Sequence, residues 1–388
     1  MKKILIVIDE RIMGGVSVLL EDMLNMINLK KYKIDILCLH NNGEMLENLP
    51  ENVSMIYGTD YFSSIDYTIK EVLKSKSIKK IYYKVRLVFD MKTGLIEKRI
   101  KKERKKILKE KYDVEVAFKD GFTALFTAFG NSKKKVHWIQ YEYKKTNPNG
   151  KYDKLFKRIL PKFNQIIAVS KGVEDAFNDL YHLEDKTSII PNLIDVNKIK
   201  NKSKEQCDVK LSSKNLNVVS VGRLHEVKAY DRLIKVIYEL KQSKKLPGNF
   251  KLRIYGDGPE KELLIGLIKI YELEKYILLM GKVNNPYKYI KENDLFILPS
   301  LFESFGLVMV ESMTLGVPVL STKNNGTSKI IKHDENGYIT ENSEEGLYKG
   351  LLHLIENQEK IKKYKNNLKD YKYENDKIIK QIEKVFDN

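Results

Sequence analysis

Short runs of apolar residues alternate along the chain with longer segments in which apolar residues recur at helical spacing. The first run, Ile4 to Ile8, has the length of a buried strand, and Val16 to Ile27 follows with apolar residues on one broad helical face. Further strands are expected at 34–39, 53–57, 114–118, 135–143, 162–170, 216–221, 250–255, 277–280, 295–298 and from 318. Strands that alternate with helices predict an α/β fold built on parallel sheets.

The clearest example of this alternation is the stretch from 294 to 322. A four-residue strand is followed by a polar loop, by an apolar helix at 307–315 that Gly316 ends as a C-cap, and by another strand. In a parallel sheet such a loop lies at the carboxyl edge, where ligands bind. The helix begins after Gly306, and its unpaired N–H groups at this edge favour phosphate binding.

Two carboxylates, Glu303 and Glu311, frame this loop with seven residues between them. Acids near a helix start are also ordinary partners of the helix dipole, so the pair alone is compatible with a structural role. With Phe305-Gly306 after the first acid and Gly316-Val317-Pro318 after the second, the stretch resembles the signature of family-4 glycosyltransferases, retaining enzymes of GT-B fold. The resemblance extends over nearly the whole chain and is strongest from 189 to 338.

The resemblance implies two Rossmann-like domains that face a central cleft, with a C-terminal helix that crosses back to the first domain. Residues 189–195 are similar to the family's interdomain hinge, and a polar, poorly periodic segment follows them. We therefore expect an acceptor-binding domain at 1–190, a hinge and linker at 191–214, a nucleotide-sugar-binding domain at 215–370, and the crossing helix at 371–388.

A cationic loop opens the second domain. Gly222 ends a strand, and Arg223 and Lys228 follow it just before a helix, so the two cations form either a phosphate clamp or a solvated pair. The family's order of motifs favours the clamp. The resemblance implies that Arg223 and Lys228 bind the donor diphosphate together with the backbone N–H groups of Ser304, Phe305 and Gly306.

The resemblance also implies roles for the remaining donor-site candidates. Glu303 is expected to hold sugar hydroxyls and to stabilise positive charge at the anomeric carbon, and Glu311 to accept hydrogen bonds from the ribose. The turn at Gly256 is similar to the family's G-x-G-P element, and the loop around Val283 to the element that meets the nucleotide base. Together these residues predict a site for a nucleotide-diphosphate sugar, which is a substrate rather than a cofactor.

The first domain supplies fewer candidates. In the resembled family the loop that ends in Gly14-Gly15 faces the donor phosphates and the acceptor, although a glycine pair also fits a tight turn. No G-x-G-x-x-G occurs there, which removes the main support for a dinucleotide-binding dehydrogenase. The segment around Trp138 resembles the family strand that delivers a catalytic histidine. Gln140 holds the usual position, whereas His137 lies three residues earlier, on the opposite strand face. Both are candidates, and His137 equally fits a role in the core.

Positive charge is concentrated in one part of the chain. The net charge of the 388 residues is +18, and residues 70–111 hold 17 Lys or Arg and five Asp or Glu. Apolar residues such as Tyr82, Tyr83, Leu87 and Phe89 are interleaved. A basic amphipathic segment fits an anionic membrane surface or a solvated face. No nucleic-acid-binding motif accompanies it, so we expect no nucleic-acid partner.

Together with these features, the family resemblance implies a retaining hexosyl- or N-acetylhexosaminyltransferase that moves a sugar, UDP-linked by expectation, to a glycan or lipid-linked glycan in bacterial cell-surface polysaccharide synthesis. The sequence holds no Asp-x-Asp motif, and we expect no metal. With two distant cysteines, a short first apolar run and no membrane-spanning run, the expected place is the cytoplasm, at the inner membrane face. The alternative is a non-catalytic GT-B partner subunit that stabilises another glycosyltransferase.

Overall fold

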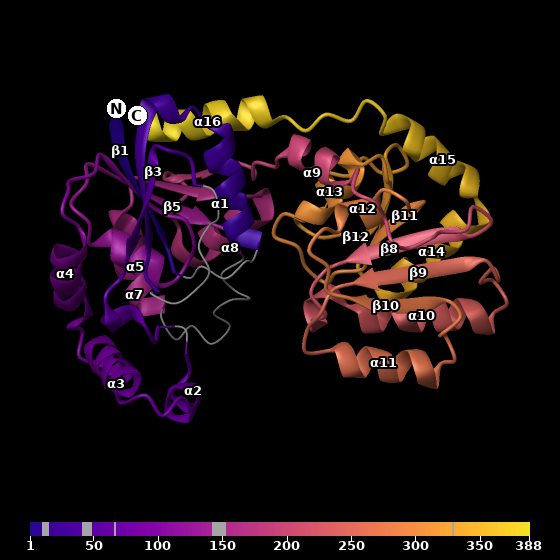
Figure 1. Ribbon diagram of the computed structural model, residues 1–388, viewed down its shortest axis with the longest axis horizontal. Helices are drawn as coiled ribbons and strands as arrows, with labels where there is room; N and C mark the ends of the chain where they lie inside the picture. The colour runs from indigo at the N-terminus through magenta and orange to yellow at the C-terminus, as the bar shows by residue number, and fades with distance from the viewer. Residues whose placement is uncertain (10–14, 41–48, 66, 142–152, 328–329) are drawn as a thin grey trace. The chain divides into compact units, whose positions relative to one another are not determined.

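The computed structural model describes residues 1–9, 15–40, 49–65, 67–141, 153–327 and 330–388. The chain forms two compact units, residues 1–194 with 375–388 and residues 195–374 (Figure 1). Each unit is a parallel sheet flanked by helices. The α/β class and the two Rossmann-like domains expected from the sequence are therefore confirmed.

The first unit is built on a seven-stranded sheet of order β3-β2-β1-β4-β5-β6-β7. Its parallel strands are β1 (Lys2–Ile8), β2 (Tyr32–Cys38), β3 (Val53–Tyr57), β4 (Val114–Ala117), β5 (Lys134–Ile139), β6 (Gln165–Ala168) and β7 (Thr187–Ile189). Its helices are α1 (Gly15–Met26), α2 (Ile69–Lys74), α3 (Ile78–Lys92), α4 (Ile96–Ile107), α5 (Phe122–Ala128), α7 (Asp153–Ile159), α8 (Lys171–Tyr181) and α16 (Asn375–Asp387). β1 is central, which explains why Ile4 to Val7 form an unbroken apolar run that is buried on both faces.

The second unit is built on a six-stranded parallel sheet of order β10-β9-β8-β11-β12-β13. Its strands are β8 (Leu216–Val221), β9 (Phe250–Tyr255), β10 (Ile277–Gly281), β11 (Leu295–Leu298), β12 (Val319–Thr322) and β13 (Gly337–Thr340). Its helices are α9 (Val196–Lys202), α10 (Tyr230–Gln242), α11 (Lys261–Ile270), α12 (Tyr287–Ile290), α13 (Leu307–Thr314), α14 (Glu344–Glu356) and α15 (Gln358–Asn367). Both sheets therefore place the fourth strand of the unit beside its first.

The chain returns to the first unit through α16. Phe386 packs edge-on against Tyr32 of β2 with ring centroids 5.5 Å apart, and Ile378 and Ile382 are buried. Asn375 closes the return, because its Nδ2 donates to Ile194 O at 2.8 Å and its Oδ1 accepts from Ile194 N at 3.3 Å. The chain thus leaves and re-enters this unit at one point.

The segment expected as a linker is ordered differently from the sequence-based interpretation. The division between units falls after Ile194, four residues beyond the expected end of the first domain. Helix α9 occupies the start of the expected linker and packs on α12 and α13 of the second unit. Its start signal is within the hinge motif itself, since the Asp195 side chain accepts from Lys198 N at 2.8 Å as an N-cap.

Candidate functional site

The predicted donor-site residues gather where the second sheet reverses its strand order. This reversal lies between β8 and β11, and ligands of open α/β sheets bind in the crevice that it leaves at the carboxyl ends of the strands. The loop after β8 holds Gly222, Arg223 and Lys228, and the loop after β11 holds residues 303–306. Topology therefore brings the two predicted loops to one edge of the sheet.

Lys228 and Glu303 are in direct contact at this junction. Lys228 Nζ donates to Glu303 Oε1 at 2.6 Å, and Ser300 Oγ donates to the same oxygen at 2.7 Å. Glu303 is buried, so the ion pair and the hydrogen bond replace the water that its carboxylate has lost. The backbone also joins the two loops, because Leu301 N donates to Val227 O at 2.9 Å. The charged pair is thus held by the scaffold.

The N-terminus of α13 opens beside this pair. Gly306 is the N-cap with φ 80° and ψ 53°, a left-handed conformation that favours glycine. A Cβ at this position would lie 2.3 Å from Met309 Cε, so a larger residue would also displace that side chain. As a glycine, the N-cap residue supplies no side-chain cap to the first turn of α13. Its N–H groups and the positive end of its dipole therefore suit an anion.

Glu311 lies in the second turn of α13 and is half-buried. Its Oε1 accepts a hydrogen bond from Tyr287 OH of α12 at 3.3 Å. Tyr287 and Ser300 thus belong to the site, although sequence reasoning missed both. Ser300 had a weak signal, because it is the first polar residue after β11. Nothing in the spacing paired Tyr287 with an acid 24 residues later.

Gly222 and Gly256 have a packing reason for being glycine. A Cβ on Gly256 would lie 1.8 Å from Gly222 O, and a Cβ on Gly222 would lie 2.8 Å from Tyr230 OH. The two strand ends are joined by a hydrogen bond from Gly222 N to Tyr255 O at 3.0 Å. These glycines therefore let the loops after β8 and β9 approach each other at the edge where the charged pair lies.

Arg223 differs from Lys228 in its surroundings. Its side chain is exposed and makes no hydrogen bond or ion pair with the described residues, so the guanidinium is available to a ligand at the same edge. Val283 is half-buried after β10, where it packs against the apolar cluster under α12 and α13. Its side chain therefore anchors this loop to the second unit.

The candidates of the first unit lie in a different setting. Gly15 begins α1, and Gly14 before it falls outside the described residues. His137, on β5, is completely buried, with Nε2 3.1 Å from Asp120 Oδ1 and its ring 5.2 Å from that of Phe163. Gln140 follows β5 and is buried, and its Nε2 has no hydrogen-bond partner among the described residues. Burial of His137 in this unit favours a positioning role over direct contact with a substrate.

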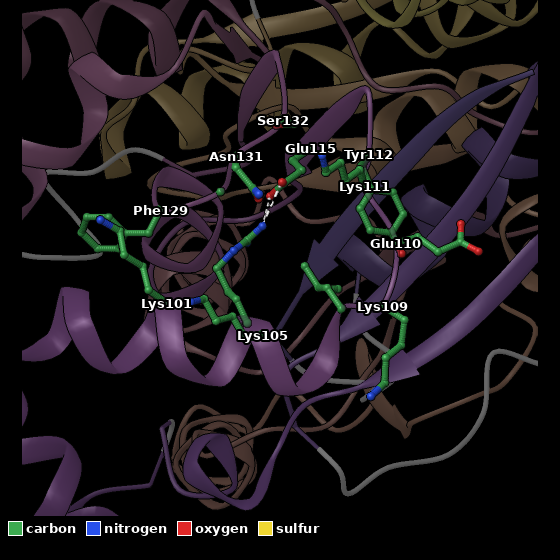
Figure 2. Close-up of a pocket in the computed structure, with 13 residues that line it drawn as sticks. Lys101, Lys105, Lys109, Glu110, Lys111, Tyr112, Glu115, Phe129, Asn131 and Ser132 are labelled. Carbon is green, nitrogen blue, oxygen red and sulfur yellow. Dashed lines mark hydrogen bonds and ion pairs between the residues drawn. The ribbon is translucent and has the colours of Figure 1, made fainter.

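A pocket of about 630 Å³ lies at the amino edge of the first sheet, between α4 and the starts of β4 and β5 (Figure 2). At its base Arg104 Nη2 donates to both oxygens of the buried Glu115 at 2.8 Å, and Nη1 donates to Phe126 O at 2.9 Å. The lysines that line it are Lys101, Lys105, Lys109 and Lys111. None of the predicted site residues lines this pocket, so it is separate from the candidate site.

Two further features are absent from the described ranges. Within them, no group of three or more His, Cys, Asp or Glu side chains is placed to hold a metal ion. Nor does any helix in those ranges combine the length and the apolar character needed to cross a membrane.

Residues 201–371 match the family described as glycosyl transferases group 1. The chain carries a group 1 glycosyltransferase domain. The match contains both loops of the β8–β11 junction, with Arg223, Lys228, Glu303 and Glu311. The ion pair at that junction is therefore part of this glycosyltransferase domain.

Individual proteins agree with this assignment. The chain is 35% identical over 231 residues to a protein of Campylobacter jejuni, the N-acetylgalactosamine-N,N'-diacetylbacillosaminyl-diphospho-undecaprenol 4-alpha-N-acetylgalactosaminyltransferase. The aligned residues make up 58% of this chain and 60% of that protein. The chain is 29% identical over 283 residues to an uncharacterized glycosyltransferase of Haemophilus influenzae, covering 72% and 76% respectively. Anabaena Alr3699/HepE in complex with UDP and glucose is similar in structure, with TM-score 0.72, 19% identity and full coverage of both chains. With these structural neighbours, the two Rossmann-like units identify the fold as GT-B.

Proposed function

We propose that this group 1 glycosyltransferase is a retaining enzyme of family 4 that moves a sugar from a UDP-linked donor to a lipid-linked glycan in cell-surface polysaccharide synthesis. The observation that carries the proposal is the Lys228–Glu303 pair at the strand-order reversal of the matched domain. The UDP complex of the Anabaena protein supports the donor, and the undecaprenol-linked substrate in the name of the Campylobacter relative supports the acceptor.

The leaving diphosphate needs positive charge at the β8–β11 junction. Lys228 is already held there, the exposed Arg223 supplies a second cation, and the backbone N–H groups of residues 304–306 supply neutral donors. Preorganised donors of this kind stabilise a developing anion without a divalent ion. We therefore propose metal-independent transfer.

The two carboxylates act on the sugar and on the nucleoside. Glu303 keeps one oxygen on Lys228 and Ser300, which leaves its other oxygen for sugar hydroxyls and for the positive charge at the anomeric carbon. Glu311, oriented by Tyr287, accepts from the ribose hydroxyls. The backbone of the loops at Gly222, Gly256 and Val283 completes the donor site.

The acceptor belongs to the first unit in this proposal. Gly15, at the start of α1, is the candidate for facing the acceptor, and Gln140 is the candidate for the polar group that contacts it, with the buried His137 as a positioning residue. A lipid-linked acceptor places the enzyme at the cytoplasmic face of a membrane, where the basic region 70–111 suits an anionic leaflet.

The donor proposal is tested by thermal unfolding with UDP, UDP-glucose, UDP-N-acetylglucosamine, UDP-N-acetylgalactosamine and GDP-mannose. A bound ligand raises the unfolding temperature with the logarithm of its concentration, so the donor that binds best is expected to give the largest rise. Release of the nucleoside diphosphate from that donor is then measured with acceptor, in excess EDTA. A strict requirement for magnesium or manganese contradicts the proposed chemistry, and binding without any transfer indicates the alternative partner subunit.

A further inference from the structure

Helix α3 carries apolar side chains on a face that nothing in the described structure covers. Ile78, Tyr82, Val85 and Phe89 are 85%, 60%, 64% and 50% exposed. Their spacing of four, three and four residues places all of them on one side of the helix. The neighbouring helix α2, which contacts α3, exposes Ile69 and Leu73 one turn apart. The α2–α3 face is defined here by these six side chains.

The opposite side of α3 attaches it to the fold. Leu87 and Asp90 are buried there. Asp90 accepts from Arg99 Nε of α4 at 3.0 Å and from Tyr61 OH at 3.1 Å. The contacts of Leu87 and Asp90 therefore hold α3 in place, and the exposed apolar side chains on its other side take no part in this. Leu87, one of the apolar residues that made the basic segment a candidate for a membrane surface, belongs instead to this anchor.

The charges around the α2–α3 face are almost all positive. Residues 67–93 contain eight Lys or Arg and two acids. Both acids are used within the fold: Glu71 closes the capping box of α2 with Thr68, and Asp90 is the buried anchor. Within the described part of this window no exposed carboxylate is left unengaged, and the nearby, partly exposed Asp60 is paired with Lys79 of α3 at 2.9 Å, so the other cations give the surface its basic and apolar character.

This combination favours lipid over protein as the occupant. Lysine is depleted in protein–protein interfaces, whereas Lys beside Tyr, Phe and aliphatic side chains is the composition of helices that lie in an anionic membrane interface. The row of lysines on α4 is less suited, because Lys101 pairs with Glu97 and Lys106 with Glu103, both at 2.8 Å. No described residue of α4 exposes a large apolar side chain.

We propose that the α2–α3 face is the membrane-docking surface of this protein, and that it binds an anionic lipid leaflet. Ile78, Tyr82, Val85 and Phe89 enter the headgroup region, while lysines such as Lys70 and Lys74 contact lipid phosphates. The inference rests on the proposed function only in that a lipid-linked acceptor lies at such a leaflet.

The test is sedimentation of the full chain with phosphatidylglycerol–phosphatidylcholine vesicles at low salt, with pure phosphatidylcholine vesicles for comparison. The variant Ile78→Ser/Tyr82→Ser/Val85→Ser/Phe89→Ser changes exposed positions only. It is expected to lower the partition coefficient on anionic vesicles by on the order of tenfold or more. The matched control Leu263→Ser/Ile270→Ser removes exposed apolar side chains from α11 in the second unit and is expected to bind like the parent.

Charge variants decide which basic helix contributes. Lys70→Glu/Lys74→Glu on α2 is expected to remove most of the salt-sensitive binding, and Lys101→Glu/Lys105→Glu on α4 to remove much less. The proposal is overturned if the parent fails to sediment, if the serine variant of α3 sediments fully, or if only the α4 variant loses binding. It is also overturned if the α3 variant abolishes self-association measured by light scattering but leaves vesicle binding intact.

Transfer to a water-soluble glycan acceptor, measured in parallel, separates this inference from the proposed enzyme activity. The α3 variant is expected to keep that transfer, since none of its positions belongs to the candidate site. If the parent protein binds vesicles but transfers no sugar, only the proposed function is contradicted. Normal transfer without vesicle binding contradicts the docking surface alone.

Discussion

The two units carry an ion pair at the same topological point, with the charges exchanged. In the first unit Asp9 follows the first strand and Lys119 follows the fourth, and Lys119 Nζ lies 3.0 Å from Asp9 Oδ2. In the second unit Lys228 follows the first strand and Glu303 the fourth, at 2.6 Å. Because first and fourth strands are neighbours in both sheets, the loops that follow them meet in both. The shared topology thus brings two oppositely charged loops together in each unit. The local sequence around each ion pair determines what that pair can do.

The helix that follows each junction shows the difference. After β11, Gly306 starts α13, which carries Glu311 in its second turn. After β4, Gly121 starts α5, whose sequence FTALFTA contains no charged residue and is buried from its second residue onward. The second junction therefore stands beside a helix N-terminus that suits an anion, whereas the first is a charged pair backed by an apolar helix. Only the second lies within the range that matches group 1 glycosyltransferases.

The largest expected effect is on transfer when the second junction loses one partner. Lys228→Met and Glu303→Gln are each expected to lower kcat by about 100- to 1000-fold, because a preorganised electrostatic contact in the transition state is removed. Steady-state kinetics with the best UDP-sugar measures this. The control Lys235→Met changes an exposed lysine of α10 and is expected to leave kcat unchanged. Full turnover in both junction variants would remove Lys228 and Glu303 from the mechanism.

The first junction is expected to contribute mainly to stability. Lys119→Met removes a cation that lies 3.0 Å from the buried Asp9 carboxylate and is expected to lower the free energy of unfolding by about 2–3 kcal/mol. Urea denaturation measures the loss of stability, and the folded Lys119→Met variant is expected to bind UDP normally. A marked fall in UDP affinity would show that the first junction also takes part in binding, and the distinction between the two junctions would be wrong.

The two helix-starting glycines allow a finer comparison. Gly306 and Gly121 have φ of 80° and 90°, so alanine at either position is expected to cost about 1–2 kcal/mol of stability. Only Gly306→Ala is expected to reduce transfer as well, since it moves the N–H groups of α13 and its Cβ meets Met309. Thermal unfolding and UDP release measure the two effects separately. Equal loss of transfer in both variants would indicate a general effect of strain.

The smallest expected effect is on the pH dependence of stability, and it concerns a residue of the second unit only. Hydrogen bonds from Lys360 and Tyr364 lower the pKa of Asp334 to about 2, from an ordinary value near 3.8. A depressed acid pKa contributes stability that is complete above the unfolded value and is lost as the pH falls through the folded one. Asp334→Asn is therefore expected to destabilise the protein by less than about 1 kcal/mol at pH 7, because the pair is partly solvated. Denaturation curves at pH 7 and pH 2 measure whether the difference disappears in acid.

The strands and the donor loops were predictable because their signals are local. The apolar runs at 4–8 and 295–298, the C-cap Gly316 and the spacing of Glu303 and Glu311 are each contained in a short window. The contacts between loops were not predictable in this way. Lys228 and Glu303 are 75 residues apart, and Asp9 and Lys119 are 110 apart, so their pairing depends on the strand order of the whole sheet.

The errors near the unit boundary and in the basic region have the same origin. Residues 191–214 are polar and poorly periodic, yet α9 forms there because Asp195 caps it and α12 and α13 pack on it. Leu87 and Phe89 are both apolar residues among lysines, so composition does not distinguish them, yet Leu87 is buried and Phe89 is exposed. Which side of a basic helix faces the protein is set by its neighbours, here Tyr61 and Arg99, and not by composition.

The hydrogen bonds between Asn375 and Ile194 also have a consequence for synthesis on the ribosome. The second unit is inserted in the sequence between those two residues, so all of it is translated before α16. It can therefore complete its sheet while the first unit still lacks the helix that covers Tyr32. The first unit thus begins translation before the second and finishes folding after it, and until α16 emerges it presents an uncovered apolar surface to the chaperones that meet nascent chains.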